Sequence, residues 1–282
     1  MTPPDLVLSN GSKNHHVRHL QHALKKAGFN LFVDGDFGDE TEKAVMAYQR
    51  QMDLVVDGIA GPKTRAALAG HDCKCLLKES DLISAAKRLG VDLATIKAVN
   101  EVESRGEGFF APGKPAILYE RHIMHRQVRE FIAGFGGTVE SIDLDLAELV
   151  ATLPNLVNPR PGGYSGGMAE YPRLARAKMI NTEAAISSCS WGAFQIMGFH
   201  SARLGYPSAQ AYADAMKVSE ANHLDAFVRF IETDPALHKA MKARKWAKFA
   251  EIYNGPAYAR NLYDVKLARA YQRHSQLLQV AA

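Results

Sequence analysis

The spacing of apolar residues predicts helices along most of the chain. Two apolar stripes near the N-terminus recur every three or four positions, namely Val17, Leu20, Ala23 and Leu24, and then Ala44, Val45, Ala47, Tyr48 and Met52. This spacing places apolar side chains on one face of an α-helix, where they can be buried. Further amphipathic helices are predicted at residues 143–153, 174–179, 209–216, 219–231 and 246–252. Strand-like alternation occurs only in short pieces, so we expect a mainly α fold.

Helix-capping residues locate two adjacent helices in the middle of the chain. Ser80 or Asp81 can accept hydrogen bonds from the free N–H groups at the start of the first helix, which ends at Gly90. Asp92 can cap the second helix, which is predicted to run from residue 93 to about residue 104.

The front of the chain contains an internal repeat. The pattern D-G-x-x-G-x-x-T-x-x-A begins at Asp34 and again at Asp57. Asp and Gly favour tight turns, and Gly35 and Gly58 can adopt a positive φ angle at little cost. Each turn is followed by a residue suited to the start of a helix. The pattern therefore predicts a small three-helix bundle over residues 1–70.

This repeat resembles the common peptidoglycan-binding module of three helices. The matching motifs are V-x-x-L-Q-x-x-L-x-x-x-G, D-G-x-F-G-x-x-T-x-x-A-V-x-x-Y-Q and D-G-x-x-G-P-x-T, between Val17 and Leu68. The resemblance implies bacterial peptidoglycan as the partner. It also implies a wall-binding surface built from the two turns, with the residues Asp34, Gly35, Phe37, Asp57 and Gly58. Such modules usually accompany a hydrolase, so we expect a catalytic part to follow.

The length of 282 residues suits two domains. Residues 71–80 interrupt the helical periodicity and are predicted to form a linker between a binding domain at 1–70 and a catalytic domain at 81–282. The linker contains no run of Pro, Gly or Ser, so the two domains are expected to pack together rather than swing freely.

Two candidate catalytic carboxyl groups, Glu101 and Glu103, lie near the end of the helix predicted from residue 93. Glycoside hydrolysis needs a carboxylic acid that is still protonated near neutral pH. A helix-end position against apolar side chains raises the pKa of such an acid by desolvation. Glu103 lies in the middle of the apolar face, whereas Glu101 projects from the opposite side, beside Ala94 and Ala98. A pair of solvated or salt-bridged glutamates would show the same pattern.

Three segments resemble the signatures of the lysozyme-like superfamily, which includes goose-type lysozymes and soluble lytic transglycosylases. They are E-S-x-G at 103–106, G-A-F-Q-I-M at 192–197 and A-E-I-Y-N-G at 250–255. A closer resemblance, over residues 82–274, is to the phage N-acetylmuramidase family, through A-V-x-E-V-E-S-x-G-x-G-F, I-L-Y-E-R-H, S-W-G-A-F-Q-I-M-G and Y-N-G-P-x-Y. Members are endolysins that often carry this binding module. The resemblance implies a helical lysozyme-like fold and hydrolysis of the β-1,4 bond between N-acetylmuramic acid and N-acetylglucosamine.

The two resemblances differ on which glutamate is the acid. The E-S signature of the superfamily points to Glu103, whereas the muramidase family points to the first glutamate of E-V-E-S, which is Glu101. The small residues Ala94 and Ala98 would leave room for a glycan cleft beside Glu101. Glu103 would then be a buried partner, tied to Arg121. We expect Glu101 to be the acid and keep Glu103 as the alternative.

Further polar and aromatic residues in the matched motifs are candidates for substrate binding. Amide and phenol groups such as those of Gln195 and Tyr253 would hydrogen-bond sugar hydroxyl and N-acetyl groups, although Tyr253 and Trp191 could equally be aromatic core. No Asp occupies a motif position that the resemblance marks as catalytic. The reaction would therefore either invert or use the acetamido group of the substrate. The candidates are Glu120, Arg121, Trp191, Gln195, Tyr253 and Asn254.

Composition argues against several other classes of protein. The net charge of +4 is too small to indicate a nucleic-acid binder. No H-E-x-x-H motif occurs, and the pairs Cys73/Cys75 and His122/His125 lack further ligands at metal-binding spacing, so we expect no metal or cofactor. The glycine-rich segment 161–168 has no following Lys-Ser/Thr, which argues against a phosphate loop and favours a mobile loop at the cleft.

The start of the sequence does not resemble a signal peptide, and no apolar stretch is long enough to insert into a membrane. We therefore expect a monomer that is made in the host cytoplasm and reaches periplasmic peptidoglycan after release by a separate membrane-permeabilising protein. Two alternative functions are a lytic transglycosylase, which leaves a 1,6-anhydro sugar, and a non-catalytic wall-binding protein.

Overall fold

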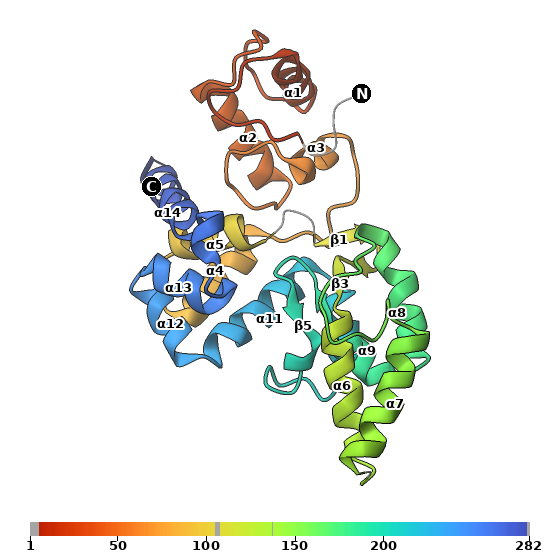
Figure 1. Ribbon diagram of the computed structural model, residues 1–282. Helices are drawn as coiled ribbons and strands as arrows, with labels where there is room; N and C mark the ends of the chain where they lie inside the picture. The colour runs from red at the N-terminus through yellow and green to blue at the C-terminus, as the bar shows by residue number, and fades with distance from the viewer. Residues whose placement is uncertain (1–5, 105–107, 137, 281–282) are drawn as a thin grey trace. The chain divides into compact units, whose positions relative to one another are not determined.

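The computed structural model describes residues 6–104, 108–136 and 138–280, and these residues are mainly helical, as predicted (Figure 1). The chain divides into two compact units. The first consists of the chain up to Val102 together with the chain from Ala236 onward, and the second runs from Glu103 to Pro235. No helix in the described ranges is both long and apolar enough to cross a membrane.

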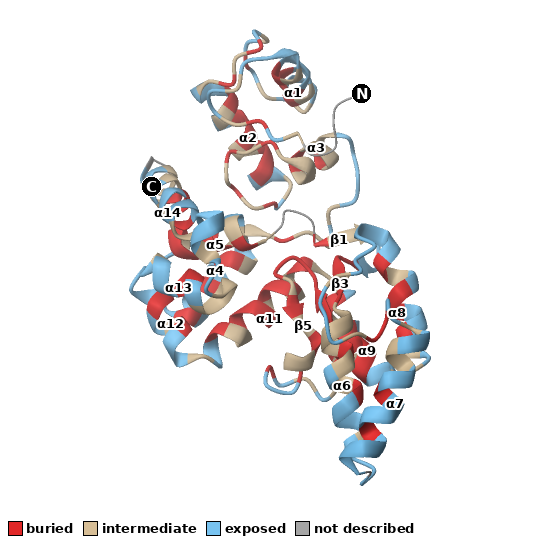
Figure 2. Ribbon diagram, in the orientation of Figure 1, coloured by how far each residue is buried: buried red, intermediate tan, exposed pale blue. Residues whose placement is uncertain are grey.

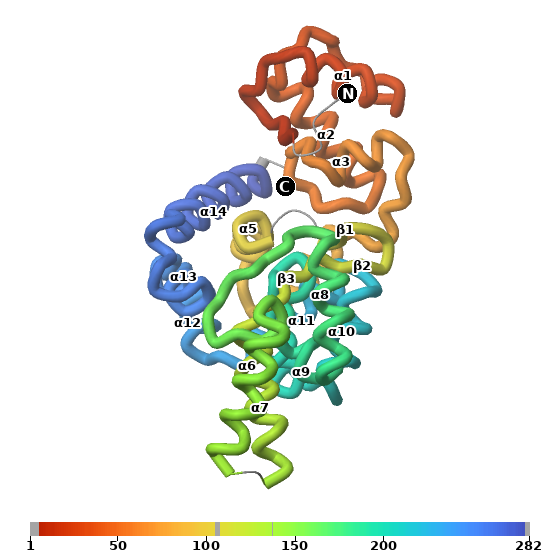
Figure 3. The backbone as a smooth tube through the Cα atoms, turned by 45° about the vertical axis from the view of Figure 1, so that its right-hand side comes forward, coloured from red at the N-terminus to blue at the C-terminus, as the bar shows by residue number. Residues whose placement is uncertain are grey.

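The first unit is helical. Its elements, of which two extend one residue into the second unit, are α1 (His15–Lys26), α2 (Asp39–Gln51), α3 (Pro62–Leu68), α4 (Glu79–Leu89), α5 (Leu93–Glu103), α12 (Pro235–Lys242), α13 (Trp246–Asn254), the 3₁₀ helix η3 (Tyr258–Asn261) and α14 (Tyr263–Val280). Figures 1 and 3 show α14 close to α5.

The helices α1, α2 and α3 form the predicted three-helix bundle, called the N-terminal bundle below. The apolar stripes of α1 and α2 face its core, where Val17, Leu24 and Val45 are buried. Phe37, from the first Asp-Gly turn, is also buried there. The predicted periodicity therefore identified the faces of these helices that pack together.

Each Asp-Gly turn is closed by a buried glutamine from the preceding helix. In the second turn, Gln49 Nε2 donates to Asp57 Oδ1 at 2.7 Å, and Gln49 Oε1 accepts from the Gly58 N–H at 3.0 Å. Gln21 makes the same contacts in the first turn, at 2.8 and 2.9 Å. Both turn glycines have the expected positive φ, 84° at Gly35 and 72° at Gly58. The sequence repeat is thus a repeat of one hydrogen-bond network.

Replacing Gln49 with alanine is expected to destabilise the N-terminal bundle by about 2 kcal/mol, because a buried polar group left without a partner costs roughly 1–3 kcal/mol. Urea denaturation would measure the change. Gln51→Ala, at an exposed position of the same helix, serves as the control. Equal effects of the two substitutions would show that the network does not stabilise the turn.

The two helices that lead to the candidate acid begin and end close to the predicted positions. Asp92 Oδ1 accepts from the Thr95 N–H at 2.7 Å, which confirms Asp92 as the cap of α5. Helix α4 ends at Gly90, whose φ is 63°, as predicted. Its start differs, because Lys78 is the cap and Asp81 Oδ2 accepts from the Lys78 N–H at 3.0 Å. Asp81 therefore takes part in a capping box from inside the helix.

The second unit combines short strands with helices. Its elements are β1 (Phe109–Ala111), β2 (Lys114–Pro115), β3 (Ile117–Tyr119), α6 (Arg121–Ala133), α7 (Val139–Thr152), η1 (Gly167–Ala169), α8 (Glu170–Lys178), α9 (Thr182–Ser187), β4 (Cys189–Trp191), β5 (Ile196–Met197), η2 (Gly198–His200), α10 (Ala209–Met216) and α11 (Glu220–Glu232). The helix predicted at 209–216 matches the bounds of α10.

A small antiparallel sheet in the order β3-β4-β5 lies within the second unit. Ile117 pairs with Trp191, and Ser190 pairs with Met197. All residues of β4 are buried, and α11 is buried along most of its length, whereas α7 is largely exposed (Figure 2). The sheet holds two of the sequence motifs together, because β3 precedes Glu120 and β4 precedes Gln195.

Candidate active site

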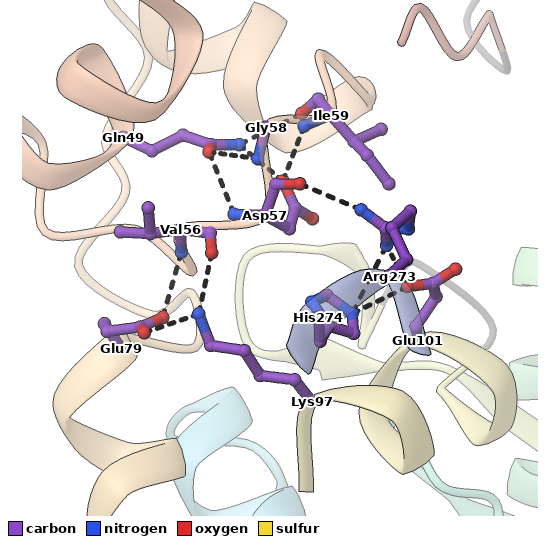
Figure 4. A network of polar contacts seen from close by, with 10 residues as sticks. All are labelled: Gln49, Val56, Asp57, Gly58, Ile59, Glu79, Lys97, Glu101, Arg273 and His274. Carbon is purple, nitrogen blue, oxygen red and sulfur yellow. Dashed lines mark hydrogen bonds and ion pairs between the residues drawn. The ribbon is translucent and has the colours of Figure 1, made fainter. Parts of the chain in front are cut away.

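Glu101 is held by two basic residues from the far end of the chain (Figure 4). Its side chain is 35% exposed, and its Oε2 atom accepts hydrogen bonds from Arg273 Nη2 and from His274 Nε2, the latter at 2.8 Å. Both residues belong to α14. Arg273 also donates from Nη1 to the backbone carbonyl of Asp57, at 3.0 Å. One guanidinium therefore connects the candidate acid to the second Asp-Gly turn.

A general acid is expected to have a raised pKa, but the pKa of Glu101 is lowered. Burial raises the pKa of Glu101, but the hydrogen bond from His274 and the charges of Arg273 and His274 outweigh burial, so the pKa lies below its usual value. Desolvation therefore acts in the expected direction, but in this arrangement the nearby cations lower the pKa of Glu101 overall. Nearby cations were not visible in the local sequence, and they dominate the balance.

The side of α5 that carries Glu101 is packed. Ala94 and Ala98 are 4% and 0% exposed, and Lys97 is 3% exposed. The expectation that the two alanines leave an open surface beside Glu101 is thus wrong, because neighbouring groups cover both methyl groups.

Glu103 is the last residue of α5 and is 8% exposed. It follows Ile96 and Val99 on the apolar face, and both of these are fully buried. Its predicted position on the buried side of the helix is confirmed. The rest of the E-S-x-G motif, Arg105 and Gly106, lies outside the described residues.

Arg121 binds the backbone of the segment that leads into the glycine-rich loop. Its guanidinium donates to the backbone carbonyls of Pro154, Arg160 and Pro161 at 3.1, 2.9 and 3.0 Å. A Cβ atom on Gly163 would lie 3.1 Å from Arg121 Nη1, which suits glycine at that position. These contacts give Arg121 a role in shaping the loop.

Glu120 is the residue before α6 and faces the glycine-rich loop. Its two carboxylate oxygens share the hydroxyl proton of Tyr164, at 3.0 and 2.9 Å, and His122 Nδ1 lies 3.2 Å from Glu120 Oε2. Burial raises the pKa of Tyr164, and the hydrogen bond to Glu120 raises it further. Tyr164 was not among the predicted site residues, although its position among four nearby glycines was a signal for an exposed loop aromatic.

Glu170 is a second residue that sequence reasoning missed. Its buried carboxylate accepts from the backbone N–H groups of Ser165 and Gly166 at 2.6 and 2.8 Å and pairs with Arg173 at 2.7 Å. The C-terminal part of the glycine-rich loop is therefore anchored to α8. The i, i+3 spacing of Glu170 and Arg173 was the available signal.

The side chain of Gln195 is engaged within its own hairpin. Its Nε2 atom donates to the carbonyls of Ala116 and Gly192 at 3.2 and 2.8 Å, and its Oε1 atom accepts from Ser190 Oγ at 2.7 Å. Its φ angle of 50° is unusual for a residue other than glycine. Gln195 therefore holds the turn between β4 and β5 in shape.

Trp191 and Tyr253 differ in burial. Trp191 is 2% exposed, and its indole N–H donates to the Ile186 carbonyl at 3.2 Å, which favours the core alternative. Tyr253 is partly exposed and stacks on Phe249 at 5.8 Å, and Asn254 ends α13. Glu101, Tyr253 and Asn254 belong to the first unit.

Two buried residues of α11, also missed, support the hairpin. His223 Nδ1 accepts from the Ala193 N–H at 3.2 Å, and its Nε2 lies 2.7 Å from the Met216 carbonyl. A Cβ atom on Gly192 would lie 2.6 Å from the His223 ring, so the hairpin requires glycine there. Glu220 accepts from the Gly108 N–H at 3.0 Å. The signal that could have identified them was a glutamate and a histidine three positions apart on an otherwise apolar helix.

The side chains of the predicted wall-binding residues Asp34, Phe37 and Asp57 stabilise the two Asp-Gly turns. Asp34 and Asp57 accept from glutamine side chains and from backbone N–H groups two residues on, and Phe37 is buried. Among the described residues, no group of three or more His, Cys, Asp or Glu could hold a metal ion.

Glu101→Gln is expected to change how stability depends on pH. Because the pKa of Glu101 in the folded protein lies below its ordinary value of 4.5, its carboxylate stabilises the fold above that pH, and this contribution disappears as the pH falls through the folded pKa. The wild type should therefore melt at a higher temperature than the variant near neutral pH.

Below a pH of about 4.5 this difference in melting temperature should shrink. Glu251→Gln removes an exposed ion pair with Lys248 and serves as the control, for which we expect little change across the same pH range. A constant difference between wild type and Glu101→Gln at all pH values would contradict the ion pair.

A three-helix bundle with two Asp-Gly turns, followed by helices of which one ends in two glutamates, fits the class of modular peptidoglycan hydrolases. Comparison with protein families supports this class. Residues 13–68 match a putative peptidoglycan binding domain, and residues 92–275 match the N-acetylmuramidase family. The second match covers more than half of the chain, so the chain belongs to the N-acetylmuramidase family, as predicted.

A solved structure resembles the whole chain. The endolysin of Burkholderia AP3 phage is 51% identical, with a TM-score of 0.85, and the match covers 96% of this chain and 99% of that chain. This similarity confirms the predicted fold class, a helical binding bundle followed by a larger helical domain.

Curated relatives match over shorter stretches. A probable N-acetylmuramoyl-L-alanine amidase of Bacillus licheniformis is 42% identical over 70 residues, which are 24% of this chain and 20% of that protein. A zinc D-Ala-D-Ala carboxypeptidase of Streptomyces albus G is 44% identical over 63 residues, 21% of this chain and 24% of that protein. The chain thus spans a quarter or less of these relatives, and their activities do not transfer to it.

Proposed function

We propose that this protein hydrolyses the β-1,4 bond between N-acetylmuramic acid and N-acetylglucosamine in bacterial peptidoglycan. In this proposal residues 1–70 bind the wall, residues 71–80 link the parts, and residues 81–282 form the catalytic domain. The observation that carries it is the pair of carboxyl groups, Glu101 and Glu103, at the end of α5, inside the segment that matches the muramidase family.

Glu101 is the proposed acid, and it requires a change of environment before it can donate a proton. Burial already opposes its charge, while Arg273 and His274 favour it. If the bound glycan draws either cation away, desolvation dominates and Glu101 becomes protonated. It can then donate to the bridging oxygen of the scissile bond.

Glu103 remains the alternative acid, because its buried position on the apolar face suits a protonated carboxyl group. Glu101 would then act as a carboxylate that stabilises positive charge on the sugar ring. In either case a water molecule or the acetamido group of the substrate completes the reaction.

Sugar contacts are proposed for the remaining predicted site residues. Tyr253 and Asn254 offer phenol and amide groups at the end of α13, and Glu120 and Arg121 lie at the start of α6. Gln195 and Trp191 would act through the shape of the hairpin, because their polar groups already bind within it.

We also propose that the protein acts as a monomer on periplasmic peptidoglycan, without inserting into the membrane or binding nucleic acid. Membership of a peptidoglycan hydrolase family and the peptidoglycan-binding match support the wall as the place of action. Release from the cytoplasm by a separate membrane-permeabilising protein belongs to the same proposal.

Digestion of purified peptidoglycan by the wild type, Glu101→Gln and Glu103→Gln tests the proposal. Loss of the acid should lower the rate by about 10²–10⁴-fold, and the variant that loses activity identifies the acid. Glu148→Gln, at an exposed position of α7, is the matched control and should keep full activity. Circular dichroism would check that each variant is folded.

Mass spectrometry of the released fragments decides between hydrolysis and the transglycosylase alternative. Hydrolysis leaves reducing ends, whereas a transglycosylase leaves 1,6-anhydro sugars that are lighter by one water. Full activity in both variants would rule out this site. Absence of any soluble product from the wild type would support a protein that only binds the wall.

A further inference from the structure

We propose that Arg273 is a positioning residue that holds Glu101 as a carboxylate and ties it to the second Asp-Gly turn of the N-terminal bundle. The inference rests on the proposed catalytic role of Glu101. It goes further, because it assigns a function to two residues of α14 and links the wall-binding part of the chain to the ionisation of the candidate acid.

The geometry of Arg273 carries the proposal (Figure 4). One terminal nitrogen, Nη2, donates to Glu101 Oε2, and the other, Nη1, donates to the Asp57 carbonyl at 3.0 Å. The guanidinium is planar and presents donors in fixed directions, so both contacts can form at once. A lysine has one nitrogen and could not span the two acceptors in the same way. His274 is buried beside it and completes the environment of the carboxylate.

A second contact fixes the same turn against α5. Lys97 lies one helical turn before Glu101, and its Nζ atom donates to the Val56 carbonyl at 2.7 Å. Lys97 also pairs with Glu79, whose Oε2 atom accepts from the Val56 N–H at 3.0 Å. Lys97 is buried, so removing its partner Glu79 would leave an uncompensated charge, and loss of this contact is expected to be costly. Residues 56 and 57 are therefore both held by the helices that surround Glu101.

The charged groups around Glu101 determine the direction of the effect. Arg273 and His274 face it from α14, and Asp57 faces both of them from the turn. Lys97 lies one turn away and is paired with Glu79. Without Arg273, its charge and its hydrogen bond would no longer oppose the effect of burial, so the pKa of Glu101 would rise.

The pH dependence of kcat/KM on purified peptidoglycan tests the proposal, with Arg273→Gln as the variant. The limb of the profile that reports Glu101 should move to higher pH. If Glu101 is the acid, this is the limb where activity falls as the pH rises. If Glu101 acts as a carboxylate, it is the limb where activity rises with pH. Either shift supports the proposal.

Arg269→Gln removes the same charge from an exposed position one turn earlier on α14 and serves as the matched control. Its profile should coincide with that of the wild type. Arg273→Lys should shift the Glu101 limb less than Arg273→Gln, because it keeps the charge. A profile of Arg273→Gln that coincides with the wild type would overturn the proposal. That failure differs from failure of the proposed function, in which Glu101→Gln itself keeps full activity.

Two further measurements on the full chain do not depend on activity. Titration of the Glu101 carboxyl carbon by NMR, assigned with Glu101→Gln, should show a higher pKa in Arg273→Gln. Amide hydrogen exchange in the second turn should become faster in Arg273→Gln and Arg273→Lys and stay unchanged in Arg269→Gln. An unchanged pKa would refute the effect on Glu101, and unchanged exchange would refute the link to the turn.

Discussion

One guanidinium, that of Arg273, joins three parts of the first unit. It is carried by α14, it binds the carboxylate of Glu101 on α5, and it donates to the backbone of the second Asp-Gly turn. A planar cation with several donors can satisfy two acceptors in different directions, which makes it an effective connection between separate elements. Together with the ion pair between buried Lys97 and partly buried Glu79, it holds the N-terminal bundle against the helix that ends in the candidate acid.

Opposing effects act on the pKa of Glu101. Partial burial favours the neutral acid, and the neighbouring cations favour the carboxylate. Such a group changes its preferred state when a single neighbour moves, whereas a solvated carboxylate would not. A catalytic acid must be protonated before it reacts and ionised afterwards, so an environment that contains both effects suits proton transfer. Glu103 is buried on the apolar face of α5 and is the last residue of that helix. It therefore remains a candidate for the acid.

Local features of the fold were predictable from the sequence, but the residues that contact the candidate acid were not. The bounds of α10, the Asp92 cap of α5 and the end of α4 at Gly90 depend on residues a few positions apart. By contrast, Arg273 is separated from Glu101 by most of the chain. No local pattern tells which basic residue of α14 faces α5, and none tells that neighbouring groups would cover Ala94 and Ala98.

The sequence by itself determined the helical class, the duplicated Asp-Gly turn and the family, because periodicity, turn chemistry and motif spacing act over short stretches of chain. Only the tertiary structure decided that Trp191 is buried, that the amide of Gln195 is occupied within its hairpin, and that Arg273 and His274 contact Glu101 and lower its pKa. Burial and ionisation depend on which groups from remote segments surround a side chain, and this is established only when the chain packs.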